Sequence, residues 1–135
     1  MCRTLKTGKI HTISNGTVEV FIENLEKPNG VLANDNVLYF LVSGALYKTG
    51  PDRPIKLAEG MDKSTDALEQ VKPGEFVVSC WSGLIYYVTD LGKVTLMLDT
   101  RPRQTNAADI GYDPATQTVF VPTFFKKGVV GYKLK

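Results

Sequence analysis

The chain has 135 residues, enough for one domain with a hydrophobic core. Its 16 Lys and Arg against 14 Asp and Glu give a formal net charge of +2, which argues against a nucleic acid as the partner. No apolar run approaches the roughly 18–20 residues that span a bilayer, and the first residues contain no apolar stretch typical of a signal peptide. We therefore expect a cytoplasmic protein that binds neither membranes nor nucleic acids.

The first part of the chain predicts a β-hairpin. Asn15-Gly16 separates two β-rich segments, residues 9–14 and 17–22. Asn-Gly favours a two-residue hairpin turn because both turn positions need a positive φ. These segments are expected to be the two outer strands of a blade.

A repeated module follows the hairpin three times. Each copy opens on a polar residue before an apolar run, and the openings at Asn29, Asp66 and Asp109 are 37 and 43 residues apart. That period is typical of four-stranded β-propeller blades. Two β segments follow each opening: residues 37–42 and 45–48, residues 75–80 and 84–88, and residues 118–124 and 129–134.

These segments predict an all-β fold, three blades' worth of a six-bladed β-propeller. We expect one half-propeller domain over residues 1–135, with blade parts at residues 9–22, 29–58, 66–98 and 109–134. Three blades cannot close a ring alone, since closed rings need roughly four to eight.

Two ways of completing the ring stay open. The chain is half of a longer protein, or each of two copies gives its front outer strand to the last blade of the other. The second arrangement is a six-bladed homodimer, and the predicted strand count fits it apart from one surplus strand near the start of the chain.

The three polar openings predict a site at one end of the channel, where the first strands of all blades begin. Amide and carboxylate oxygens are the ligands that calcium prefers, so Asn29, Asp66 and Asp109 are candidate metal ligands. A bound cation polarises a carbonyl group and lowers the pKa of a bound water, and Asp66 is the candidate general base. Turn formation explains Asn29 and Asp66 equally well, so a structural role stays open for both.

Other catalytic schemes have little support. His11 is the only histidine and lies in the expected first hairpin, and the chain contains neither a Gly-x-Ser-x-Gly motif nor a glycine-rich phosphate motif. Cys2 and Cys80 are far apart and belong to no zinc motif. Cys80 is expected to be a buried free thiol, because it lies inside an apolar strand.

Aromatic and basic residues near the C-terminus have two interpretations each. Trp81, Phe124 and Phe125 either line a pocket or pack between blades. The basic residues either hold an anionic substrate or form solvated loops; they are Arg101, Arg103, Lys126 and Lys127.

Three short motifs are similar to those of one protein family. They are Pro28-Asn29-Gly30-Val31, Thr65-Asp66-Ala67-Leu68 and the segment Asn106-Ala107-Ala108-Asp109-Ile110-Gly111-Tyr112. They resemble the senescence marker protein, gluconolactonase and luciferin-regenerating enzyme family, and the resemblance corresponds to the C-terminal half of a typical member. It implies a six-bladed propeller with a divalent metal, often calcium, at one end of the channel, and hydrolysis of lactones and related esters.

The family's metal ligands match this sequence in part. Asn29 matches the Asn of the family's Pro-Asn-Gly motif, and Asp66 matches its Asp, although Ala67 replaces the usual Gly. The family's first-blade Glu has no counterpart, and Asp109 matches no family ligand. The resemblance implies a metal-dependent lactone or ester hydrolase or a truncated relative of one. The alternatives are a non-catalytic propeller that binds a partner and a fragment suited to propeller assembly.

Overall fold

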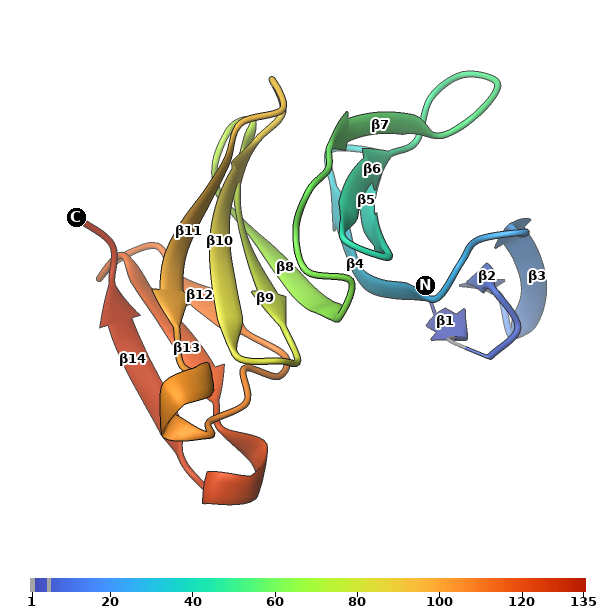
Figure 1. The fold of residues 1–135 in the computed structure, drawn as a ribbon. Coiled ribbons are helices and arrows are strands. Elements are labelled where there is room, and N and C mark those ends of the chain that lie inside the picture. The colour runs from blue at the N-terminus through green and yellow to red at the C-terminus, as the bar shows by residue number, and fades with distance from the viewer. Residues whose placement is uncertain (1, 5) are drawn as a thin grey trace.

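The chain forms four antiparallel β-sheets that follow one another in sequence (Figure 1). The computed structural model describes residues 2–4 and 6–135, with side chains from residue 6 onward. The first sheet contains β1 (Cys2–Thr4), β2 (Lys9–Ser14) and β3 (Thr17–Ile22). The second contains β4 (Pro28–Asn34), β5 (Val37–Val42), β6 (Ala45–Lys48) and β7 (Ile55–Ala58).

The other two sheets have the same meandering order. The third contains β8 (Thr65–Lys72), β9 (Glu75–Cys80), β10 (Leu84–Thr89) and β11 (Val94–Asp99). The fourth contains β12 (Gly111–Asp113), β13 (Thr118–Pro122) and β14 (Val129–Lys133). Two short 3-10 turns, η1 (Arg101–Arg103) and η2 (Phe124–Lys126), lie in the connections. In the part of the chain that is described, no helix has the length and hydrophobicity to cross a membrane.

The predicted all-β class is confirmed, and so is the first hairpin. Ser14 pairs with Thr17 across a turn in which Asn15 and Gly16 have φ of 50° and 78°. The prediction was wrong at residues 123–124, where a continuous strand was expected. There β13 ends at Pro122, and Phe124 takes a φ of 49°, which a strand does not allow.

The hydrophobic core lies between neighbouring sheets, and β9 shows why. Successive side chains of a strand point to opposite faces. Phe76 and Val78 pack with Leu41 and Leu46 of the second sheet, whereas Val77 packs with Val119 of the fourth. Because β9 is covered on both faces, it is a nearly continuous apolar strand.

A glycine repeat establishes which strands correspond. The carbonyl groups of Gly8, Gly44 and Gly83 each accept a hydrogen bond from the backbone N–H of the residue 17 positions later, at 3.0, 3.1 and 2.8 Å. All three glycines have positive φ, and a Cβ on any of them would lie 2.4–2.5 Å from a carbonyl oxygen. Gly8 follows β1 as Gly44 follows β5 and Gly83 follows β9.

The repeat therefore makes β1 the counterpart of the second strand in the four-stranded sheets. Among the described residues, the first sheet lacks a first strand and the fourth sheet lacks a fourth strand. Two strands, β1 and β2, therefore precede β3 in its sheet, whereas the sequence predicted one. The prediction missed β1 because three residues are too few to show an alternating pattern.

Candidate functional site

Asn29 and Asp66 meet across two neighbouring sheets. Each is the second residue of the first strand of its sheet, β4 and β8, and these strands lie side by side (Figure 1). The side-chain amide Nδ2 of Asn29 donates a hydrogen bond of 2.8 Å to Oδ1 of Asp66, and both residues are half-buried. Two of the three predicted site residues are thus in contact although 37 positions separate them.

Bulges at equivalent places orient this pair. The register between β4 and β5 shifts between Asn29 and Val31, and the register between β8 and β9 shifts between Thr65 and Leu68. A bulge adds a residue to one strand and redirects the side chains beside it. Both side chains therefore leave the alternating pattern of their strands where the two sheets adjoin.

Gly30 is required at the first of these bulges. Its φ is 32°, and a Cβ there would lie 2.8 Å from Cδ1 of Leu41 and 2.9 Å from the carbonyl oxygen of Asp66. Its N–H donates a hydrogen bond of 3.1 Å to Oδ1 of Asn29. The amide of Asn29 is consequently held at both ends, by Gly30 and by Asp66.

Asp62, which the sequence did not single out, is a second carboxylate near Cys80, whose pKa the charges of both Asp62 and Asp66 affect. Its Oδ1 accepts hydrogen bonds from the N–H of Ser64 at 2.8 Å and from the Ser64 hydroxyl at 2.5 Å. These hydrogen bonds lower the pKa of Asp62, so its carboxylate is ionised at neutral pH. An Asp-x-Ser turn motif was the only signal for it in the sequence.

Cys80 is a buried free thiol, as predicted. Burial raises the pKa of Cys80 to about 12, and the negative charges of Asp62 and Asp66 add to this rise. Its Sγ lies 3.7 Å from the carbonyl oxygen of Asp62, to which it donates. A thiol with so high a pKa is protonated at neutral pH and is therefore a poor nucleophile.

Asp109 lies apart from the pair, between two residues that pack where the third sheet meets the fourth, Ala107 and Ile110. It is exposed, in a bend two residues before β12 rather than at the start of a strand. Burial raises the pKa of Glu69, and the nearby charge of Asp109 raises it further. The preceding residue is anchored to β8 through Ser79, whose hydroxyl donates to the carbonyl of Ala108 at 2.8 Å and accepts from the N–H of Ala67 at 3.2 Å.

The donor set of the pair suits a hard cation in type but not in number. Asn29 and Asp66 offer one amide and one carboxylate, whereas calcium takes six to eight oxygen ligands. In the part of the chain that the structure describes, no three His, Cys, Asp or Glu side chains are grouped to hold a metal ion. Any metal site that uses this pair needs further ligands from outside it.

Comparison with known proteins supports the fold alone. No family model matches the sequence, and no curated protein is similar to it in sequence. Among solved structures, a luciferin-regenerating enzyme superposes with a TM-score of 0.63 at 16% identity, over 87% of this chain and 44% of that one. A chain of a nidogen/laminin complex superposes with a TM-score of 0.67 at 12% identity, over 93% of this chain and 58% of that one.

A third similar structure is the extracellular domain of BT4673 from B. thetaiotaomicron, with a TM-score of 0.60 at 14% identity, over 87% of this chain and 16% of that one. The chain thus spans less than two thirds of each of these proteins. Together with the four meandering sheets, these similarities show a partial, propeller-like β fold.

Proposed function

We propose that the chain forms half of a six-bladed propeller of the gluconolactonase-like family and hydrolyses lactones or related esters with the help of a divalent cation, calcium by preference. The observation that supports this most directly is the Asn29–Asp66 pair. The two residues that match the family's ligands in sequence are also the two that meet in space. The repeat alone brings the two positions near each other, but a purely local turn function does not require a hydrogen bond between their side chains.

Asn29 and Asp66 have different roles in this proposal. Both would hold the cation, which when bound polarises the substrate carbonyl and makes a water more acidic. Asp66 is the general base: its carboxylate takes a proton from the water that attacks the carbonyl carbon. Asn29 positions Asp66 through the 2.8 Å hydrogen bond, and ionised Asp62 makes the surroundings more favourable for a cation.

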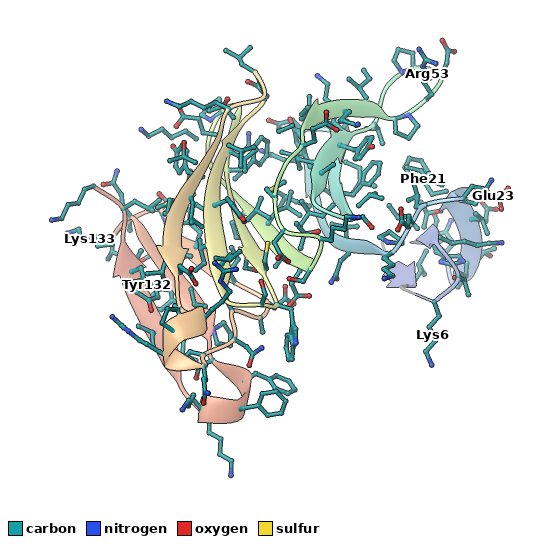
Figure 2. All side chains as sticks on the ribbon, viewed as in Figure 1. Lys6, Phe21, Glu23, Arg53, Tyr132 and Lys133 are labelled. Atoms are coloured by element: carbon teal, nitrogen blue, oxygen red, sulfur yellow. The ribbon has the colours of Figure 1, made fainter. Side chains whose placement is uncertain are left out.

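A second copy of the chain is the proposed source of the remaining ligands. The fourth sheet lies at one end of the row of sheets and the first sheet at the other, with Tyr132 and Lys133 of β14 and Phe21 of β3 on these end sheets (Figure 2). Within the described residues, no strand pairs with the outer edge of β14, and unpaired edges favour further strand pairing. Val18, Val20 and Phe21 of β3 are exposed.

Pairing of β3 with β14 of the partner would join the two copies into one ring with two Asn29–Asp66 pairs. Because β1 and β2 precede β3 in its sheet, the first sheet has to open for this exchange. The alternative source of ligands is the remainder of a longer chain.

A non-catalytic binding propeller is the second candidate. The number of ligands favours it, since no group of three metal-binding side chains occurs in the described part of the chain. Such a protein would keep the Asn29–Asp66 hydrogen bond as a structural link between two sheets.

Calcium titration combined with a hydrolysis assay separates the two candidates. For the wild type we expect calcium to raise the melting temperature and to support hydrolysis of a simple lactone. Asp66→Asn preserves the shape of the side chain but removes the base and the charge, so it should abolish both effects. Asp52→Asn, in an exposed loop, is the matched control and should behave as the wild type. A wild type that responds to calcium in neither assay would favour the binding module.

A further inference from the structure

Three aromatic side chains lie together in solvent at the end of the molecule where β8 begins. Trp81 follows β9, and Phe124 and Phe125 open η2, which lies at the same end as the β9–β10 turn (Figure 1). The ring centroids of Trp81 and Phe124 are 4.8 Å apart, and so are those of Phe124 and Phe125, both with edge-to-face geometry. The three residues are 37%, 58% and 70% exposed, so packing between sheets does not account for them.

The loop that presents Phe124 is tightly held in a strained conformation. Phe124 has a φ of 49°, which is uncommon for a bulky residue. Buried Thr123 fixes the loop: its N–H and its hydroxyl donate to the carbonyl of Gly128 at 2.8 and 3.0 Å, and the hydroxyl accepts from the N–H of Gly128 at 3.1 Å. Backbone strain of this kind recurs at functional sites, where the surrounding structure holds it in place.

Hydrogen bonds connect Trp81 to the segment that contains Asp66. The N–H of Trp81 donates to the carbonyl of Ser64 at 2.8 Å, and the carbonyl of Trp81 accepts from Nδ2 of Asn106 at 2.8 Å. Ser64 lies two residues before Asp66. Trp81 is therefore anchored to the segment that leads into β8 and Asp66.

Basic residues lie at the same end of the molecule as the cluster (Figure 1). Lys126 and Lys127 directly follow Phe125, and Arg103 lies in η1 at the same end of the molecule (Figure 1). All three are exposed and, among the described residues, have no ion pair. Arg101 differs, because it already holds Asp99 through two hydrogen bonds of 2.9 and 2.7 Å.

We propose that Trp81, Phe124 and Phe125 form a binding surface for the aromatic ring of an anionic ligand, an aryl carboxylate. Aromatic rings contact one another favourably edge to face, and ammonium or guanidinium groups bind carboxylates through charge-assisted hydrogen bonds. The inference rests on the proposed function in one respect only: there, this ligand is the aryl carboxylate that is released when water cleaves the acyl C–O bond of an aryl-substituted lactone or ester.

Fluorescence provides a direct test because Trp81 is the only tryptophan of the chain. We would titrate the protein with 3-phenylpropionate, with 3-phenyl-1-propanol, which lacks the charge, and with propionate, which lacks the ring. The expected result is a saturable change in Trp81 emission with 3-phenylpropionate, several-fold weaker binding of the alcohol and no response to propionate. Equal responses to all three probes, or none, would overturn the proposal.

Two variants and a control assign the effect to the cluster. Phe125→Ala and Lys126→Gln alter exposed side chains and should each weaken 3-phenylpropionate binding several-fold. Leu91→Ala removes a 93% exposed apolar side chain from a distant turn and should leave binding unchanged. If Phe125→Ala also binds as the wild type, the rings do not form the site.

The fluorescence assay also distinguishes failure of the aryl site from failure of the proposed function. If 3-phenylpropionate binds more weakly as the protein concentration rises, a second copy covers the rings, and the proposal is overturned. Binding is measured without calcium and without turnover. Binding of 3-phenylpropionate without lactone hydrolysis would thus contradict only the proposed function, and hydrolysis without a Trp81 response would contradict only the aryl site.

Discussion

The side-chain amide of Asn29 donates a 2.8 Å hydrogen bond to the carboxylate of Asp66, and this contact joins the first strands of two neighbouring sheets. A second amide contact joins the same strands further along, where Nδ2 of Asn34 donates to Oε1 of Gln70 at 2.5 Å. The two contacts differ in charge. Only the first includes a carboxylate, so only the first should respond to a cation.

The effect of Asn29→Asp on the melting temperature should therefore depend on calcium. Without a cation, the two carboxylates would repel each other, and we expect a lower melting temperature than for the wild type. With calcium, the added carboxylate is a stronger ligand, so the calcium-induced rise in melting temperature should exceed that of the wild type. Thermal unfolding with calcium and with a chelator measures both effects.

Asn34→Asp is the matched control for that experiment, since it alters the second amide contact between the same strands. It should show no larger calcium response than the wild type. Equal calcium responses in both variants would mean that the Asn29–Asp66 end of the strands has no special affinity for cations.

Gly44 should be one of the least replaceable residues of the fold. Its φ is 87°, and a Cβ would lie 2.5 Å from the carbonyl oxygen of Met61. We expect Gly44→Ala to lower the free energy of unfolding by about 3 kcal/mol, because the strained φ is combined with a backbone clash. Urea unfolding monitored by circular dichroism gives this value.

Gly16→Ala separates the two causes. Gly16 has a φ of 78° but no atom within 4 Å of the position of a Cβ. The free energy of unfolding of Gly16→Ala should fall by only about 1 kcal/mol, because the strained φ is the only cost. If Gly44→Ala lowers the free energy of unfolding no more than Gly16→Ala does, the structural role of the glycine repeat is contradicted.

Cys80 should make the protein less stable at alkaline pH. Its pKa is raised from 9.0 to about 12 in the folded chain, so above pH 9 the unfolded chain releases the thiol proton first. The free energy of unfolding should consequently fall as the pH rises from about 9 towards 12. Cys80→Ala removes this contribution, so its stability should fall less steeply over the same interval. Parallel pH dependences for the two proteins would show that Cys80 is not buried as described.

The sequence predicted the elements that local chemistry specifies. Asn15-Gly16 identified the first hairpin, and the 37-residue spacing of Asn29 and Asp66 identified equivalent positions in successive sheets. Equivalent positions of adjacent blades lie side by side, which is why their contact could be expected from the repeat.

The remaining features depend on the tertiary structure. The bulges at Asn29 and Asp66 come from register shifts against the next strand. Gly30 is a local signal for the first bulge, whereas the segment around Asp66 contains no glycine to mark the second. The strand expected through Phe124 ends at Pro122 because Thr123 and Gly128 close a loop by hydrogen bonds between side chain and backbone. Asp109 followed the repeat in sequence, but the longer connection before β12 places it in an exposed bend near Glu69.

Native mass spectrometry of the wild type and of Asp66→Asn, with and without calcium, tests the central claim most directly. We predict that the wild type has about twice the mass of the 14.9 kDa chain and binds calcium, and that Asp66→Asn is a dimer without it. A wild-type chain that remains a folded monomer and binds no calcium would contradict both the completed ring and the cation site at Asn29 and Asp66.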